Sequence, residues 1–89
     1  MNFEWDEAKR LKTLRDRGLD FGSADQVFDG RPTLDSSTDR SGEARTLTIA
    51  EIDGKIVATV WTWRGDTIRI ISMRRARIGE ERAYRELYQ

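Results

Sequence analysis

The sequence lacks cysteine and histidine entirely, and it contains a single proline among its 89 residues. Without cysteine, the chain can form neither a disulfide nor a cysteine-ligated zinc site. Without histidine, a histidine acid–base pair and any histidine-containing catalytic triad are excluded. Catalysis by this chain would therefore have to use arginine, lysine, carboxylate, tyrosine or serine side chains.

Net charge and long apolar runs are also missing. Sixteen Lys and Arg residues balance sixteen Asp and Glu residues, which argues against adhesion to nucleic acid over the whole surface but allows a local basic patch. The longest apolar run, residues 55–63, is half as long as a membrane-spanning helix, and the charged N-terminus does not resemble a signal peptide. We therefore expect a cytoplasmic protein without membrane association, formed by a single domain over residues 1–89.

Helical signals dominate the first third of the chain. A helix is predicted over residues 7–17, because Asp6 is suited to its N-cap and Gly18 to its C-terminal stop. Ser23 begins a capping-box pattern, which predicts a second, short helix over residues 23–28. Before these helices lies a possible short edge strand, residues 3–5.

Strand signals dominate most of the remaining sequence. Pro32 precedes a short predicted strand over residues 33–36, and the polar stretch 36–44 is predicted to be a loop. Alternating β-branched and aromatic residues then predict three long strands, over residues 45–52, 55–63 and 67–73, with hairpin turns at residues 53–54 and 64–66. A final helix is predicted over residues 80–88. This order predicts the α+β class: N-terminal helices, an antiparallel β-sheet of three to four main strands, and a C-terminal helix.

Arginine is concentrated where the last predicted strand ends. Six arginines lie between Arg64 and Arg82, against three carboxylates. By the period-2 rule, Arg69, Ile71 and Met73 share one face of this strand, whereas Ser72 and Arg74 continue the face of Ile68 and Ile70. Two readings remain open: a surface that binds phosphate, and a solvated surface on which the arginines pair with carboxylates.

Other patterns carry less chemistry. Trp61 and Trp63 share a strand face, which suits base stacking on an exposed sheet but more often indicates core or a contact with a partner protein. The chain contains no phosphate-binding glycine loop, and its carboxylates lack the spacing of a metal site, so no cofactor and no metal are expected.

Several motifs, taken together, resemble one family. The chain begins with FEWDEAKRLKTLRDRGLDF and A..VF, continues with GE.R, and closes with RGDTIRIISMRRA and E..AY. In this order and at this length the motifs resemble the BrnT-type toxins. One departure stands out, because relatives usually carry Lys-His-Gly where this chain has Asp16-Arg17-Gly18.

The resemblance implies a RelE-like fold and a ribonuclease toxin of a bacterial type II toxin–antitoxin system. It also implies a cognate antitoxin, BrnA-like and with a ribbon-helix-helix DNA-binding part, that neutralises the toxin. Operator DNA would be contacted only through this antitoxin. RNA would be the substrate and translation would be inhibited.

The resemblance also implies functional positions. The catalytic residues would be Arg64, Arg69, Ser72, Arg74, Arg75 and Lys9. The substrate-binding residues would be Tyr84, from the resemblance, and Arg17, Arg77 and Arg82, from their charge and position in the chain.

Metal-independent cleavage would use the ribose 2′-OH as nucleophile, with the arginines on the phosphate. Lys9, Tyr84 and Glu7 are the candidates for the acid and the base. The alternative is a non-catalytic interaction module, or an inactive toxin homologue, whose arginine cluster docks a DNA-binding partner.

Overall fold

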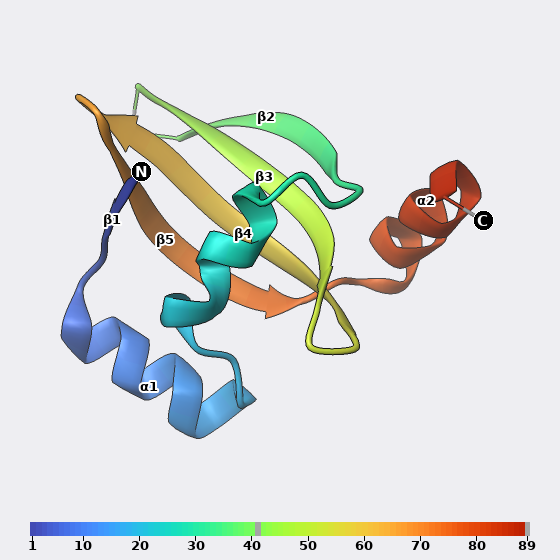
Figure 1. Cartoon of the computed structure of the whole chain (residues 1–89), viewed down its shortest axis with the longest axis horizontal. Helices are drawn as coiled ribbons and strands as arrows, with labels where there is room; N and C mark the ends of the chain where they lie inside the picture. The colour runs from blue at the N-terminus through green and yellow to red at the C-terminus, as the bar shows by residue number, and fades with distance from the viewer. Residues whose placement is uncertain (41, 89) are drawn as a thin grey trace.

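The computed structural model describes residues 1–40 and 42–88, in which five strands form a single sheet and three helices pack around it (Figure 1). The elements in chain order are β1 (Asn2–Glu4), α1 (Glu7–Arg17), the 3₁₀ helix η1 (Phe21–Phe28), β2 (Leu34–Arg40), β3 (Glu43–Ile52), β4 (Lys55–Arg64), β5 (Thr67–Arg75) and α2 (Ile78–Tyr88).

The sheet is mixed, with the strand order β1-β5-β4-β3-β2. The α+β class is confirmed, but the prediction of an antiparallel sheet with three to four main strands is wrong. Strand β1 pairs with β5 in parallel, while the other pairs are antiparallel. A parallel pair needs a long crossover, which here consists of most of the chain, so no local turn signal announces it.

Helix α1 has the predicted bounds, residues 7–17. Its N-cap is Asp6, whose Oδ1 accepts a hydrogen bond from the Lys9 amide at 3.2 Å. Gly18 ends the helix with a φ of 69°, and its amide donates to the Leu14 carbonyl at 3.0 Å. Side-chain and backbone chemistry at the two ends therefore determine this helix locally.

The second helix differs from its prediction in start and type. It is a 3₁₀ helix that begins at Phe21, and its N-cap is Asp20, whose Oδ1 accepts from the Gly22 amide at 2.9 Å. The predicted cap, Ser23, lies inside the helix. Burial of Phe21, which is fully covered in the core, accounts for the earlier start.

The predicted loop over residues 36–44 is wrong for most of its length. Strand β2 continues to Arg40, and β3 begins at Glu43; Ser41 of this stretch lies outside the described residues. The polar sequence of β2 fits its position, because an edge strand exposes side chains that a central strand would bury.

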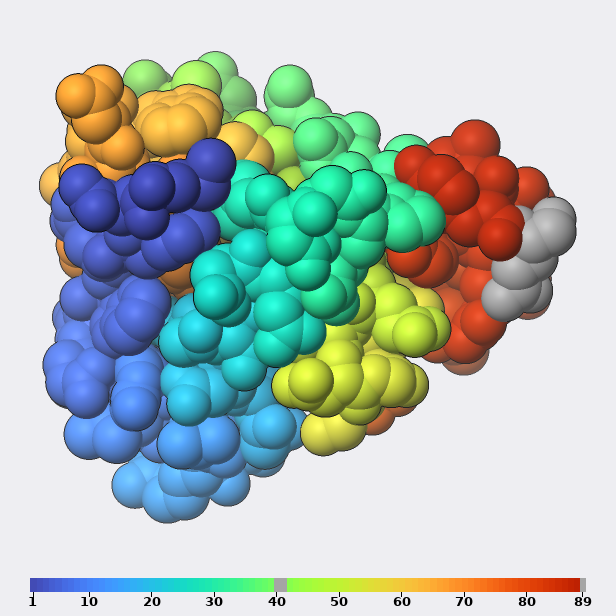
Figure 2. All heavy atoms as spheres, in the orientation of Figure 1, coloured from blue at the N-terminus to red at the C-terminus, as the bar shows by residue number. Residues whose placement is uncertain are grey.

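The larger core lies between the sheet and η1. In the space-filling view, η1 covers the middle of the visible face and α1, in blue, lies beside it (Figure 2). Phe21, Ile68, Ile70 and Met73 are buried there. Trp61 packs against this core and donates from Nε1 to Thr48 Oγ1 at 2.9 Å. Its neighbour Trp63 is 55% exposed, so the two tryptophans of the same strand face have different environments.

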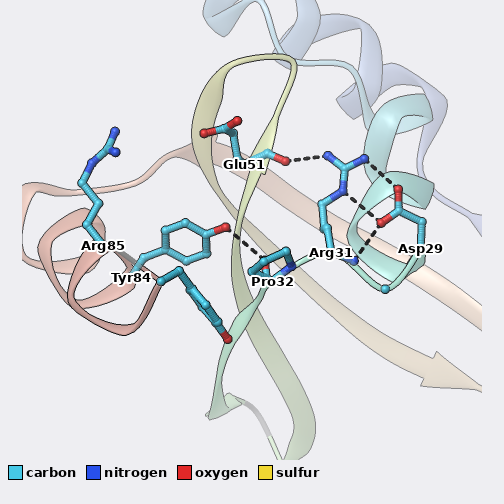
Figure 3. A pocket seen from close by; sticks show the side chains of 8 residues that line it. Asp29, Arg31, Pro32, Glu51, Tyr84 and Arg85 are labelled. Carbon is cyan, nitrogen blue, oxygen red and sulfur yellow. Dashed lines mark hydrogen bonds and ion pairs between the residues drawn. The ribbon is translucent and has the colours of Figure 1, made fainter.

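A smaller core lies on the other face of the sheet, where α2 covers only one end. Ile49, Ile56, Ala58 and Tyr84 form it. The Tyr84 hydroxyl donates to the Pro32 carbonyl at 3.1 Å (Figure 3). The rest of this face, toward the β2–β3 turn, carries no helix (Figure 1), and we call it the open face.

Arg31 lies near Tyr84 in a hollow between α2 and the end of η1, and it connects two segments there. Its guanidinium donates to the Glu51 carbonyl at 2.6 Å and to Asp29 Oδ2 at 2.7 Å (Figure 3). The hydrogen bond from Arg31 holds the pKa of Asp29 below its usual value. Hydrogen bonds from Arg31 therefore connect the segment after η1 to β3 beside α2.

In the part of the chain that the structure describes, no helix is long and apolar enough to cross a membrane.

The burial pattern predicts that alanine substitutions at two isoleucines have very different effects on stability. Ile70 is 1% exposed, whereas Ile78 is 78% exposed. We expect Ile70→Ala to lower the free energy of unfolding by about 2–5 kcal/mol, because it removes transfer energy and leaves a cavity. Ile78→Ala should change it by less than about 0.5 kcal/mol. Urea unfolding followed by circular dichroism measures both.

If Ile70→Ala does not fold, Ile70→Val provides the same comparison at a cost of about 0.5–1.5 kcal/mol. Equal effects of the core and surface substitutions would show that the packing described for β5 is wrong.

Candidate anion-binding site

A β-bulge in β5 sets the geometry of the site. Val60 pairs with Ser72, but Trp61 pairs with Ile70, so Ile71 is an extra residue in β5. The predicted period-2 assignment is therefore wrong beyond the bulge. Met73 returns to the buried face of Ile68 and Ile70, and Ser72 and Arg74 lie on the same face as Arg69.

The bulge turns Ser72 and Arg74 to a hollow on the open face, which basic side chains of α1, β3 and the β5–α2 connection also line. This basic hollow has a volume of about 450 Å³. Its polar lining consists of Lys9, Thr38, Arg45, Ser72, Arg74, Arg77 and Glu80. Four cations and one carboxylate among the described residues give this lining a local charge of +3, although the whole chain is neutral.

Arg74 is held by a carboxylate within the hollow. Its Nη1 and Nη2 donate to the two oxygens of Glu80, at 2.7 and 2.9 Å. Hydrogen bonding from Arg74, supported by the Arg77 amide, lowers the pKa of Glu80 to about 2. The same contact raises the pKa of Arg74. This bidentate pair joins β5 to the first turn of α2, so Arg74 has a structural role as well as a charge.

Arg45, on β3, is the functional residue that sequence reasoning missed. Its Nη2 lies 3.5 Å from Glu43 Oε2, and its Nε is buried without a hydrogen-bond partner in residues 1–40 and 42–88. A guanidinium has five donors, and a buried unpaired donor costs about 1–3 kcal/mol. The contact with Glu43 occupies only one terminal amino group, so Arg45 has donor capacity left for an anion, although the covered Nε cannot reach one itself.

Sequence contained only part of the signal for Arg45. The residue lies two positions before Leu47, so the period-2 rule places both on one strand face. The pairing of β3 with β4, and the bulge in β5, decide that this face is also the face of Ser72 and Arg74. Neither feature has a local sequence signature.

Lys9 and Arg77 complete the cationic lining from outside the sheet. Lys9 comes from α1, beside the edge of β5, and Arg77 from the short connection between β5 and α2. Within the described part of the chain, neither side chain forms an ion pair. Neither charge is therefore held in a direct ion pair, although Arg77 lies close enough to Glu80 to help lower the pKa of that carboxyl.

Other expected residues lie away from the hollow. Arg69 pairs with Glu4 on β1 at 2.7 Å, and Arg64 is exposed at the far end of β4. Arg75 pairs with Val57 and so lies on the opposite face of β5 from Arg74. Arg82 is exposed on α2 and does not line the hollow. The arginines that are close in sequence are thus spread along and across the sheet.

Three further candidate residues also lie outside the basic hollow. Tyr84 is 8% exposed and lies in the smaller core with its hydroxyl on Pro32, so it does not line the basic hollow. Arg17 donates from Nη1 to the Met73 carbonyl at 2.8 Å, which fixes the end of α1 to the edge of β5. The acid–base candidate Glu7 accepts a hydrogen bond from Trp5 and also lies outside the hollow.

The hollow suits an anion with several oxygens. Guanidinium and ammonium donors line the same hollow as Ser72, and a volume of about 450 Å³ lies in the range of small-molecule sites. Among the described residues, no group of three or more Asp and Glu side chains is placed to hold a metal ion. The charge and shape of the lining favour phosphate over a cation.

Fold and site together define a small α+β protein with a basic hollow on a partly uncovered sheet face. The family model described as "ribonuclease toxin, BrnT, of type II toxin-antitoxin system" matches residues 5–80. The chain therefore belongs to the BrnT toxin family, which confirms the resemblance seen in its motifs. Membership also indicates an antitoxin as partner. No individually curated protein matches the chain.

The Arg74–Glu80 pair predicts an acid-sensitive contribution to stability. Because the pKa of Glu80 falls from 4.5 to about 2 on folding, its contribution is fully present above about pH 4.5 and is lost as the pH falls toward 2. We expect Glu80→Gln to cost about 1 kcal/mol at pH 7, a modest value because the pair is partly exposed. The cost should shrink toward zero near pH 2.

Denaturant unfolding at several pH values between 7 and 2 measures this difference. Glu86→Gln, at an exposed position on the same helix, is the matched control and should be close to neutral throughout. A Glu80→Gln effect that stays constant with pH would contradict the assigned ion pair.

Proposed function

We propose that the chain is a metal-independent endoribonuclease toxin that binds the scissile phosphate of RNA in the basic hollow. The observation that carries the proposal is that four cations line one hollow together with Ser72, in a chain with no net charge. Membership of the BrnT family supports ribonuclease chemistry. The proposal treats residues 1–89 as one toxin domain that acts in the cytoplasm.

The proposed reaction is an internal transesterification. The ribose 2′-oxygen attacks the adjacent phosphorus, the P–O5′ bond breaks, and a 2′,3′-cyclic phosphate remains. The 2′-OH proton passes to solvent, and the leaving 5′-oxygen takes a proton. Charge accumulates on the non-bridging oxygens during the attack, so fixed guanidinium donors beside them lower the barrier.

The lining residues divide this work according to their contacts. Arg45 and Arg77 supply guanidinium groups that no bidentate carboxylate neutralises, and Ser72 supplies a hydroxyl donor. Lys9, in its ammonium form, is the candidate donor to the leaving 5′-oxygen. Arg74 adds positive charge but is oriented by Glu80, so its removal would change both the charge and the position of α2.

The cognate antitoxin is proposed to be BrnA-like, with a ribbon-helix-helix part that carries all contact with operator DNA. It would neutralise the toxin by covering the open face, because RNA must reach the hollow through this face. Inhibition of translation would follow from loss of mRNA. A RelE-like arrangement remains part of this proposal.

One set of contacts favours the alternative, an inactive homologue or a non-catalytic docking module. Arg69 and Arg74 are each paired with an internal carboxylate, Glu4 and Glu80. Moreover, Asp16-Arg17 stands where relatives usually have Lys-His. A docking module would bind its partner and cut no RNA.

Cleavage by the purified chain in the presence of EDTA distinguishes the two functions. We expect the wild type to cut RNA and to leave 2′,3′-cyclic or 3′-phosphate ends. Arg45→Gln and Arg77→Gln should each lower the rate by about tenfold to a hundredfold, since each removes a donor from the developing charge. Mass spectrometry of the products identifies the ends.

Arg85→Gln is the matched control, because Arg85 is exposed on α2 and lies outside the basic hollow. This variant should cut at the wild-type rate. Thermal unfolding of each variant separates lost activity from lost structure. An intact, folded wild type that cuts no RNA would refute the ribonuclease proposal and support the docking module.

A further inference from the structure

A second, smaller hollow adjoins the basic hollow on the side of α1. Its volume is about 240 Å³, and its lining consists of Lys9, Lys12, Thr13, Asp16, Arg17 and Ser72. We call it the helix hollow. Three cations and one carboxylate among the described residues give it a local charge of +2.

The two hollows are continuous in their lining, because both include Lys9 and Ser72. Lys9, Thr13 and Asp16 recur at helical spacing, so one stripe of α1 faces the edge of β5. Pairing of this edge with β1 ends at Arg69, and beyond it Arg17 of α1 donates to the Met73 carbonyl. The helix hollow thus follows the seam between α1 and β5 and leads directly into the basic hollow.

Two contacts determine which charges the helix hollow can present to a ligand. Arg17 uses Nη1 to donate to the Met73 carbonyl, which positions its guanidinium while other donors stay available. Asp16 lies 3.1 Å from Arg15 Nε, and Arg15 is outside the lining. The single carboxylate is therefore paired with an external cation, and the charges of Lys9, Lys12 and Arg17 dominate.

From this arrangement we infer that the helix hollow binds a second phosphate of the same RNA strand, next to the phosphate held in the basic hollow. The inference rests on the proposed function, because it names a neighbouring subsite of the same substrate. Two basic hollows that share Lys9 and Ser72 suit consecutive phosphodiesters of one strand. The RNA backbone then runs along α1, and not along β5 toward Arg64.

Short, uncleavable oligonucleotides test the second subsite directly. The probes are a 2′-O-methyl dinucleotide with one phosphodiester and a 2′-O-methyl trinucleotide with two, and binding is measured by NMR titration. We expect the trinucleotide to bind roughly tenfold more tightly, as one added charge-assisted contact allows. Two further trinucleotides, each with a neutral methylphosphonate at one linkage, should each lose most of this gain.

Lys12→Ala is the decisive variant, because Lys12 lines only the helix hollow. It should leave dinucleotide binding unchanged and remove most of the gain from the second phosphate. It should also make the salt dependence of trinucleotide binding shallower, by about 0.7 in the log–log slope. Lys55→Ala, the same substitution at the β3–β4 hairpin, controls for net charge and should change nothing.

The outcomes separate the two proposals. If Lys12→Ala retains the full trinucleotide gain, the second subsite is refuted while the basic hollow stands. If dinucleotide and trinucleotide bind equally to the wild type, the second subsite is also refuted. If the folded chain binds neither probe, the proposed function fails together with the inference drawn from it.

Discussion

The single extra residue in β5 is the constraint on which the site depends. Without the bulge at Ile71, strict alternation would place Ser72 and Arg74 on the buried face and Met73 on the open one. Burial of Met73 in the larger core and exposure of Ser72 to the hollow are therefore two results of one irregularity. Because a bulge also bends and twists its strand, it suits a position where one strand serves both a core and a site.

The arginines of this chain serve two different purposes. Arg69 and Arg74 join the sheet to β1 and α2 through carboxylates, and Arg17 attaches α1 to the edge of β5. Arg45 makes only one contact of 3.5 Å, with Glu43, and Arg77 forms no ion pair among the described residues. The elements around the hollow are thus held in place by one set of guanidinium groups, which leaves another set available to a ligand. A chain of 89 residues has a modest core, and this division lets its arginines both connect the elements and remain available to a ligand.

The sequence predicted elements whose signals are local. Asp6 and Gly18 bounded α1 correctly, and the Asp53–Gly54 hairpin joins β3 to β4 as expected. Features set by distant pairing escaped prediction: the parallel β1, the length of β2, and the bulge. The same limit applies to the site. Four of the ten expected site residues line the basic hollow, namely Lys9, Ser72, Arg74 and Arg77. Arg45 also lines it, but predicting its position would have required knowledge of the strand register.

Charge segregation explains how a neutral chain can present a site for a polyanion. Carboxylates such as Glu4 and Glu80 are paired with Arg69 and Arg74, so the positive charge that has no ion-pair partner collects along the seam of α1, β5 and the open face. A local field of this kind attracts phosphate without making the whole surface adhesive. The departure at Asp16-Arg17 is consistent with this arrangement. Arg17 keeps a cation at the seam and anchors the strand edge, while Asp16 is paired with Arg15. The positive charge of the seam therefore does not need the Lys-His pair usual in relatives. The imidazole that relatives offer for proton transfer is missing, so any proton transfer at this seam must use an amine, a carboxylate, a hydroxyl or solvent.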